Sequence, residues 1–215
     1  DALAALWYAM DENGDVLIYK EIFKGKQAFR VEDKKELIVR DAAEELLRVN
    51  DGDPICEWYA PPDLWNRNKD TGRGTAQIFS EEYGIDLSKT SNDRVQGWLD
   101  VKEWIKPIGR TNLDTGEKYV TSRMRISRKC ENLWKSMLGI QKDEHNWNDV
   151  ANEPHAYTHL PDSLRAFCAG QPLPKEAETE KKKPVHWHKD QWEDYENAPE
   201  EQKPYLISKW GNPFG

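Results

Sequence analysis

The sequence predicts a layered α/β fold, and two observations carry this prediction. Between residue 1 and about residue 170, short apolar runs of strand length alternate with segments whose apolar residues recur at helical spacing. Near the N-terminus, Asn13-Gly14 separates two apolar runs, and both residues accept the positive φ that a tight hairpin turn needs. A chain of 215 residues fits one such domain with an appendage better than two full domains.

The first half of the chain alternates strands with helices. The two hairpin strands are the runs ALAALWYAM and VLIYKEIF. Apolar residues in the range 32–49 recur at helical spacing while most charged residues fall on the other face, which predicts an amphipathic helix. Residues 74–83 suit another helix, because Gly84 can end it in a left-handed conformation. Short strands are expected at ICEWYA, which Pro61 and Pro62 end, and at IDLSKT.

The second half of the predicted domain is mostly helical. An amphipathic helix begins near residue 92, with Asn92 or Asp93 as its cap. The turn-forming residues 114–117 predict a hairpin between short strands, and RMRIS is expected to be the second of them. Two further helices are expected at residues 131–139 and at residues 161–168, the latter with Pro161 at an early position.

The alternating pattern ends at residue 171. Residues 171–184 are linker-like, with three consecutive lysines and no apolar periodicity. The segment after them is too aromatic for an inert spacer and too short for a core of its own. It either folds back on the domain or serves as a docking segment for a partner. Its aromatic residues are Trp187, Trp192, Tyr195, Tyr205, Trp210 and Phe214.

Composition narrows the classes of function. The formal net charge is -8 and the pI is near 5.3, so the chain does not hold nucleic acid by its global charge, although a local basic groove is compatible with these values. Cys56, Cys130 and Cys168 are widely spaced and predict neither a zinc site nor a disulfide framework. The sequence has no apolar run of about 18 residues and no signal-peptide layout, so we expect a soluble, intracellular protein.

Two aspartates are the strongest candidates for chemistry. The sequence contains no phosphate loop, no G-x-S-x-G elbow and no H-E-x-x-H helix. Asp63 follows a predicted strand, and open α/β folds place their sites at the carboxyl ends of strands. Asp162 lies at the start of the last predicted helix. Each has an ordinary alternative, a turn residue for Asp63 and a helix cap for Asp162, but together they can hold a divalent metal ion through oxygen.

Four segments resemble the nuclease domain of tailed-phage large terminase subunits, the motors that package and cut viral DNA. They are YAPPDLWNR, SNDRVQGWLDVKEWI, KCENL and DVANEPHAYTHLPDSLRAF, and the resemblance runs from residue 1 to about residue 170. The resemblance implies an RNase H-like fold, which is a mixed sheet flanked by helices. It divides the chain into a nuclease domain at residues 1–170 and a linker with an extended, aromatic C-terminal tail at residues 171–215.

The resemblance also implies an activity and its metal ligands. The family hydrolyses DNA phosphodiester bonds with two Mg²⁺ or Mn²⁺ ions, which prefer carboxylate oxygen. Asp63 and Asp162 correspond to two of the metal-binding positions, with Glu57 as the fallback for Asp63 because relatives carry this Asp at the position of Pro61. His159 is either a further ligand or a structural hydrogen-bond donor.

This chain also departs from the family at the first metal-binding Asp, which in the family lies on the first central strand. Asp1 is a candidate for this ligand. In the family this ligand lies a few residues before the apolar run, whereas Asp1 directly precedes the run ALAALWYAM. Asp1 therefore fits better a position just after the ligand. This predicts that the first strand and its Asp are missing from the sequence.

Basic residues in two regions are candidates for binding the DNA backbone. A loop after Asp63 and a candidate strand near residue 125 both carry several of them, and phosphate contacts position DNA without reading its bases. A solvated strand edge is the ordinary alternative for the second group. The candidates for DNA binding are Arg67, Lys69, Arg73, Arg123, Arg125, Arg128 and Lys129.

Arg165 has a different expected role, which is to orient nearby carboxylates from the edge of the core.

We therefore expect a divalent-metal-dependent endonuclease of low sequence specificity that cuts concatemeric viral DNA during genome packaging. The expected partners are double-stranded DNA, the portal and procapsid, the small terminase subunit and an upstream ATPase domain of the same polypeptide, without a membrane. The expected location is the host cytoplasm, outside the mature virion. The alternative is a catalytically silent domain that binds DNA or the portal and capsid through its aromatic tail.

Overall fold

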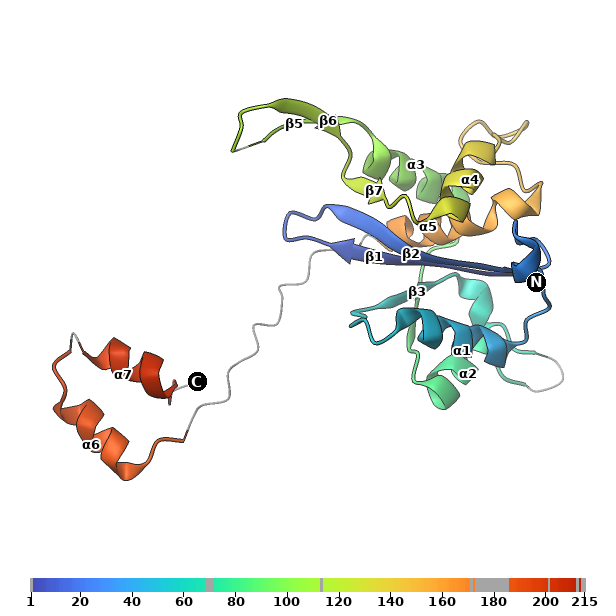
Figure 1. Ribbon diagram of the computed structural model, residues 1–215. Coiled ribbons are helices and arrows are strands. Elements are labelled where there is room, and N and C mark those ends of the chain that lie inside the picture. The colour runs from blue at the N-terminus through green and yellow to red at the C-terminus, as the bar shows by residue number, and fades with distance from the viewer. Residues whose placement is uncertain are drawn as a thin grey trace. The chain divides into compact units, whose positions relative to one another are not determined.

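The structure is a computed structural model that describes residues 2–68, 72–112, 114–170, 172, 186–200, 202–211 and 213. The chain divides into two compact units, residues 1–174 and residues 175–215. The first unit is a mixed α/β structure with three small sheets in its described part (Figure 1), so the predicted α/β class is confirmed. None of the helices in the described ranges is long and apolar enough to cross a membrane.

The largest sheet is built on the N-terminal hairpin. Strand β1 (Ala2–Met10) pairs antiparallel with β2 (Val16–Gly25), and β7 (Met124–Ile126) pairs with β2 in parallel. The hairpin forms as predicted, because Gly14 takes a φ of 76° and Asp11 Oδ1 accepts the N–H groups of Asn13 and Asp15.

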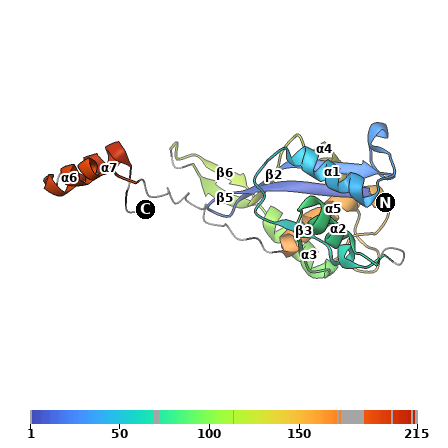
Figure 2. The same ribbon diagram turned by 90° about the horizontal axis from the view of Figure 1, so that it is seen from below.

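Two smaller sheets complete the first unit. Strands β3 (Trp58–Ala60) and β4 (Leu87–Lys89) are parallel, and Ala60 lies opposite Lys89. Their carboxyl ends therefore meet at the same edge. Strands β5 (Ile108–Thr111) and β6 (Lys118–Thr121) form a hairpin that projects beyond the helices in Figure 1 and Figure 2.

Helix ends in this unit follow local sequence signals. Gly84 has a φ of 66° and ends α2, while Asp93 caps α3 by accepting the N–H of Gln96 at 3.0 Å. The α-helices are α1 (Val39–Asn50), α2 (Thr75–Tyr83), α3 (Arg94–Ile105), α4 (Glu131–Gly139) and α5 (His159–Ala169). Short 3₁₀ helices lie at η1 (Val31–Asp33), η2 (Pro62–Trp65) and η3 (His155–Tyr157).

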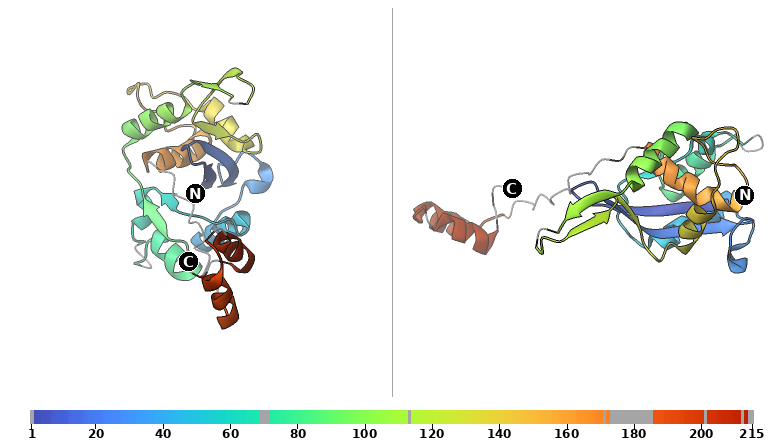
Figure 3. Two further views of the ribbon diagram at one scale, coloured as in Figure 1. Left: turned by 90° about the vertical axis from the view of Figure 1, so that its left-hand side faces the viewer. Right: turned by 90° about the horizontal axis from the view of Figure 1, so that it is seen from above.

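Two apolar clusters cover the two faces of the hairpin. Helices α3, α4 and α5 lie on one side of β1 and β2, and α1 and α2 lie on the other (Figure 3). Alternate residues of β1 serve the two clusters, since Tyr8 packs into the first and Trp7 into the second. Strand β1 is therefore covered by side chains on both faces.

The second unit is a pair of short helices, α6 (Lys189–Asn197) and α7 (Lys203–Trp210), built around Trp187. This indole is only 2% exposed, and its Nε1 donates a hydrogen bond to the carbonyl of Gly211 at 3.0 Å. Three other aromatic rings surround this ring, so the segment forms a small aromatic cluster. The three neighbours are Trp192, Tyr195 and Trp210.

Three elements differ from their predicted form. The helix expected at residues 32–49 begins only at Val39, because η1 and an irregular stretch precede it. The run RMRIS does not pair within the hairpin around residues 114–117, whose second strand is β6. It contributes β7, because Met124 and Ile126 pack into the core beside β2. The last helix begins at His159, ahead of Pro161. Apart from Pro172, the predicted linker at residues 171–184 lies outside the described residues.

Candidate functional site

Asp162 lies in the first turn of α5, where the positive end of the helix favours a carboxylate. Its Oδ1 accepts a hydrogen bond from Arg165 Nε at 3.2 Å and another from Arg94 Nη1 at 3.5 Å. Its Oδ2 has no hydrogen-bond partner in the described part of the chain, and the side chain is 32% exposed. Two guanidinium groups thus hold one oxygen of the carboxylate and leave the other available to a ligand.

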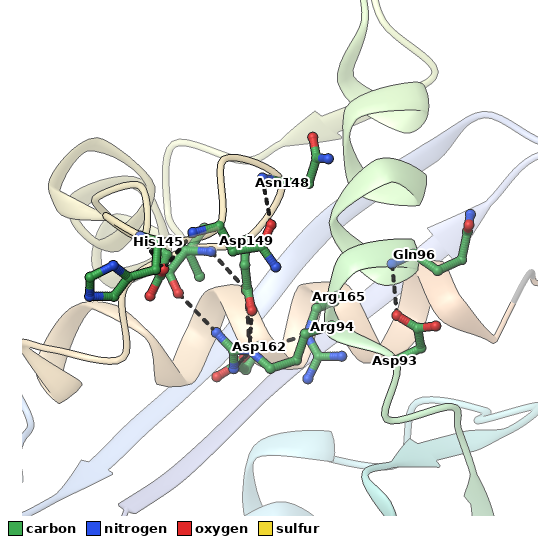
Figure 4. A network of polar contacts seen from close by, with 11 residues as sticks. Asp93, Arg94, Gln96, His145, Asn148, Asp149, Asp162 and Arg165 are labelled. Carbon is green, nitrogen blue, oxygen red and sulfur yellow. Dashed lines mark hydrogen bonds and ion pairs between the residues drawn. The ribbon is translucent and has the colours of Figure 1, made fainter.

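Arg94 connects three segments that are distant in the sequence (Figure 4). It is the first residue of α3, directly after the cap Asp93. Its Nε lies 3.1 Å from both carboxylate oxygens of Asp149, and its Nη2 donates to the carbonyl of Val150 at 3.2 Å. With the contact to Asp162, Arg94 ties α3 to α5 and to the loop that precedes η3.

Arg165 approaches the same carboxylate from inside the core. The residue is 5% exposed, and its Nη1 is buried without a hydrogen-bond partner in the described structure. It lies against Gly97 of α3, where an added Cβ would be 2.7 Å from Arg165 Cγ. Gly97 therefore gives Arg165 the space to reach Asp162. The expectation that Arg165 orients a carboxylate is confirmed.

His159 begins α5 and is half-buried next to His155. The two imidazole rings are stacked with centroids 6.0 Å apart, and His155 Nε2 lies 3.0 Å from Glu153 Oε1. Burial, and then the charge of His155, lowers the pKa of His159. Its Nε2 is buried without a partner among the described residues. His159 and Asp162 thus share the first turn of α5.

Asp63 is exposed in η2, just after β3. The parallel strands β3 and β4 end at the same edge, and the chain leaves β4 toward Arg94, which contacts Asp162. Arg94 thus links the segment after β4 to the first turn of α5. The Asp63 carboxylate has no hydrogen bond or ion pair with any described residue.

Glu57 occupies the opposite end of β3. It precedes the strand, whereas the sequence predicted it inside the strand, because regular pairing with β4 begins only at Trp58. Its Oε2 accepts a hydrogen bond from Tyr59 Oη at 2.8 Å. Burial and this bond raise the pKa of Tyr59 to about 12. Glu57 therefore lies at the amino end of β3, away from the edge that carries Asp63.

The predicted DNA-binding residues fall into two groups: those that bind other parts of the protein and those that are exposed without an ion pair in the described ranges. Arg73 forms ion pairs with Glu81 and Glu82, both at 2.7 Å. The guanidinium of Arg123 stacks 4.5 Å from the centre of the Trp104 ring and donates to a backbone carbonyl at the β1–β2 turn. These two side chains thus stabilise the protein itself. Arg67, Arg125, Arg128 and Lys129 are exposed and form no ion pair with another described residue. Lys69 and Asp1 lie outside the described residues.

The donor chemistry suits a hard divalent ion only in part. Asp162 offers an oriented carboxylate oxygen, and Asp63 offers an exposed carboxylate. Within the described ranges, however, no group of three or more His, Cys, Asp or Glu side chains is arranged to hold a metal ion. These residues alone do not complete a two-ion site.

The chain matches no family model, no curated protein and no solved structure in comparisons with known proteins.

The sequence pattern had indicated Asp162 and Arg165 but missed the bridging role of Arg94. Arg94 follows a strand at the same sheet edge as Asp63, and this position was the available signal. Its partner Asp149 lies in a loop with no regular pattern, so nothing in the sequence pointed to their contact.

Proposed function

We propose that this chain is the nuclease domain of a tailed-phage large terminase subunit and that it cuts concatemeric viral DNA with low sequence specificity. The observation that carries the proposal is the Asp162 carboxylate, which Arg94 and Arg165 hold by one oxygen in the first turn of α5. This geometry agrees with the motif HLPDSLRAF that first indicated the family. Double-stranded DNA, the portal and procapsid, the small terminase subunit and the ATPase domain are the partners that belong to this proposal.

The arrangement of β1 and β3 supports an RNase H-like sheet. Trp7 and Trp58 are in edge-to-face contact with ring centroids 6.1 Å apart, and Tyr8 and Tyr59 both pack on Phe167. The two strands thus share both covering layers, yet they are not hydrogen-bonded to each other in the described structure. In the proposed RNase H-like fold, β1 and β3 belong to one layer that the same two sets of side chains cover.

In the proposed reaction, Asp162 and Asp63 would contribute carboxylate oxygens to Mg²⁺ or Mn²⁺. The ions, when bound, supply a hydroxide for attack on phosphorus and stabilise the leaving oxygen. The chain's own contribution is to hold the Asp162 carboxylate in one orientation, which Arg94 and Arg165 achieve by binding its Oδ1. His159 would act beside it as a ligand or a hydrogen-bond donor.

Metal-dependent nicking of plasmid DNA tests the proposed activity. The protein should convert supercoiled plasmid to the nicked form in Mn²⁺ or Mg²⁺, and EDTA should stop the reaction, because carboxylate-bound ions drive the hydrolysis. Gel electrophoresis over time measures the conversion. A protein that leaves plasmid intact with both ions, across a range of ion concentrations, would contradict the proposal.

A second candidate function is a catalytically silent interaction domain. The compact, aromatic-rich helical unit favours it, because aromatic residues are enriched at protein–protein interfaces. Removing residues 185–215 should then abolish binding to purified portal, as measured by pull-down with the full chain as reference. Equal binding by the shortened protein would argue against this function.

A further inference from the structure

We propose that Arg94 is a positioning residue for the reaction at Asp162, an inference that rests on the proposed nuclease function. Arg94 contacts the candidate metal ligand through Nη1 and is anchored to Asp149 through Nε. Through Asp149 and α3 it fixes where the Asp162 carboxylate points. Replacing a residue that orients a metal ligand typically lowers metal affinity or activity by about tenfold to a hundredfold.

The bonding of Arg94 distinguishes positioning from DNA binding. All three guanidinium nitrogens are engaged by protein oxygens, on Asp149, Asp162 and the Val150 carbonyl. The side chain is 29% exposed, and a contact with a phosphate would require breaking these bonds. By contrast, Arg125 and Lys129 are exposed without ion pairs in the described structure, as phosphate-binding residues would be.

Asp149 provides a rigid anchor for Arg94. Its Oδ1 accepts the N–H of Val150 at 2.7 Å, and its own N–H donates to the Asn146 carbonyl at 2.9 Å. Its carbonyl accepts the N–H of Asp143 at 3.2 Å. The carboxylate is therefore fixed before it meets the guanidinium. A lysine at position 94 has a single nitrogen in place of the planar fork and cannot hold Asp149, Asp162 and Val150 together.

Kinetics on plasmid nicking in Mn²⁺ test this role with the full chain. Arg94→Gln should lower kcat by about tenfold to a hundredfold and leave KM for DNA unchanged. Arg94→Lys should not restore the rate, and Asp149→Asn should lower it in the same direction. Arg48→Gln is the matched control, because Arg48 also binds a carboxylate through two nitrogens, on Glu45, and should keep the parental kcat.

A measurement without metal separates this proposal from the nuclease function. In urea unfolding, a double-mutant cycle of Arg94→Gln and Asp162→Asn should show coupling of about twofold or more in the unfolding equilibrium constant. A raised KM with unchanged kcat in Arg94→Gln would assign Arg94 to DNA binding and overturn the positioning role. Absence of coupling between Arg94 and Asp162 would also overturn the positioning role. A parental protein that does not nick DNA while the coupling is present would overturn the nuclease function and leave the Arg94–Asp162 contact established.

Discussion

Asp162→Asn is expected to abolish metal-dependent nicking, with a loss on the order of a thousandfold or more. Asparagine keeps the shape of the side chain and an oxygen that Arg94 and Arg165 can bind, but it removes the negative charge that a divalent ion requires. The free energy of unfolding should fall by only about 1 kcal/mol, because the two hydrogen bonds become neutral at the acceptor. Nicking kinetics and urea unfolding measure the two effects separately.

Asp41→Asn is the matched control for this substitution. Asp41 also lies in the first turn of a helix, where its carboxylate accepts the N–H of Ile38, but it belongs to α1. Its replacement should cost stability at the helix end and leave nicking unchanged. Full activity of the Asp162 variant would remove the proposed metal ligand from the mechanism. Equal losses in both variants would mean that helix stability, and not the charge of Asp162, limits the reaction.

Local signals predicted the elements of the fold better than their partners. The hairpin follows from Asn13-Gly14, and the end of α2 follows from the positive φ that Gly84 takes. The sequence predicted that β7 pairs within the hairpin at residues 114–117, whereas it pairs in parallel with β2. Parallel strands are joined by a long connection, so no turn sequence between them indicates the pairing. Burial decided the pairing, since Met124 fits the core beside Val16.

The candidate site shows the same division. A carboxylate at a helix start is visible in the sequence, so Asp162 could be identified, and an arginine one turn later could be expected to contact it. Arg94 reaches Asp149 and Asp162 across sequence separations of 55 and 68 residues. Only the packing of α3 on α5, which Gly97 allows, brings these groups together. Whether Asp63 joins Asp162 at a metal ion stays a prediction.

Trp187→Ala should unfold the whole second unit while the first unit keeps its structure. Trp187 is in contact with three aromatic rings, whose centroids lie 5.2 to 5.5 Å from its own. Truncating a buried Trp costs about 3–5 kcal/mol. A unit this small rarely has more than about 3–5 kcal/mol of stability in total, so α6 and α7 should both melt. Far-UV circular dichroism and amide exchange of the full chain would report the loss.

Tyr205→Ala controls for the removal of an aromatic residue from the same unit. Tyr205 lies on α7 and is 64% exposed, so its loss should leave the helices folded. If the second unit carries portal binding, Trp187→Ala should lose binding as completely as removal of residues 185–215, because the binding surface exists only in the folded helices. Retained portal binding by an unfolded Trp187 variant would instead place recognition in the extended sequence, where aromatic side chains act without a fixed arrangement.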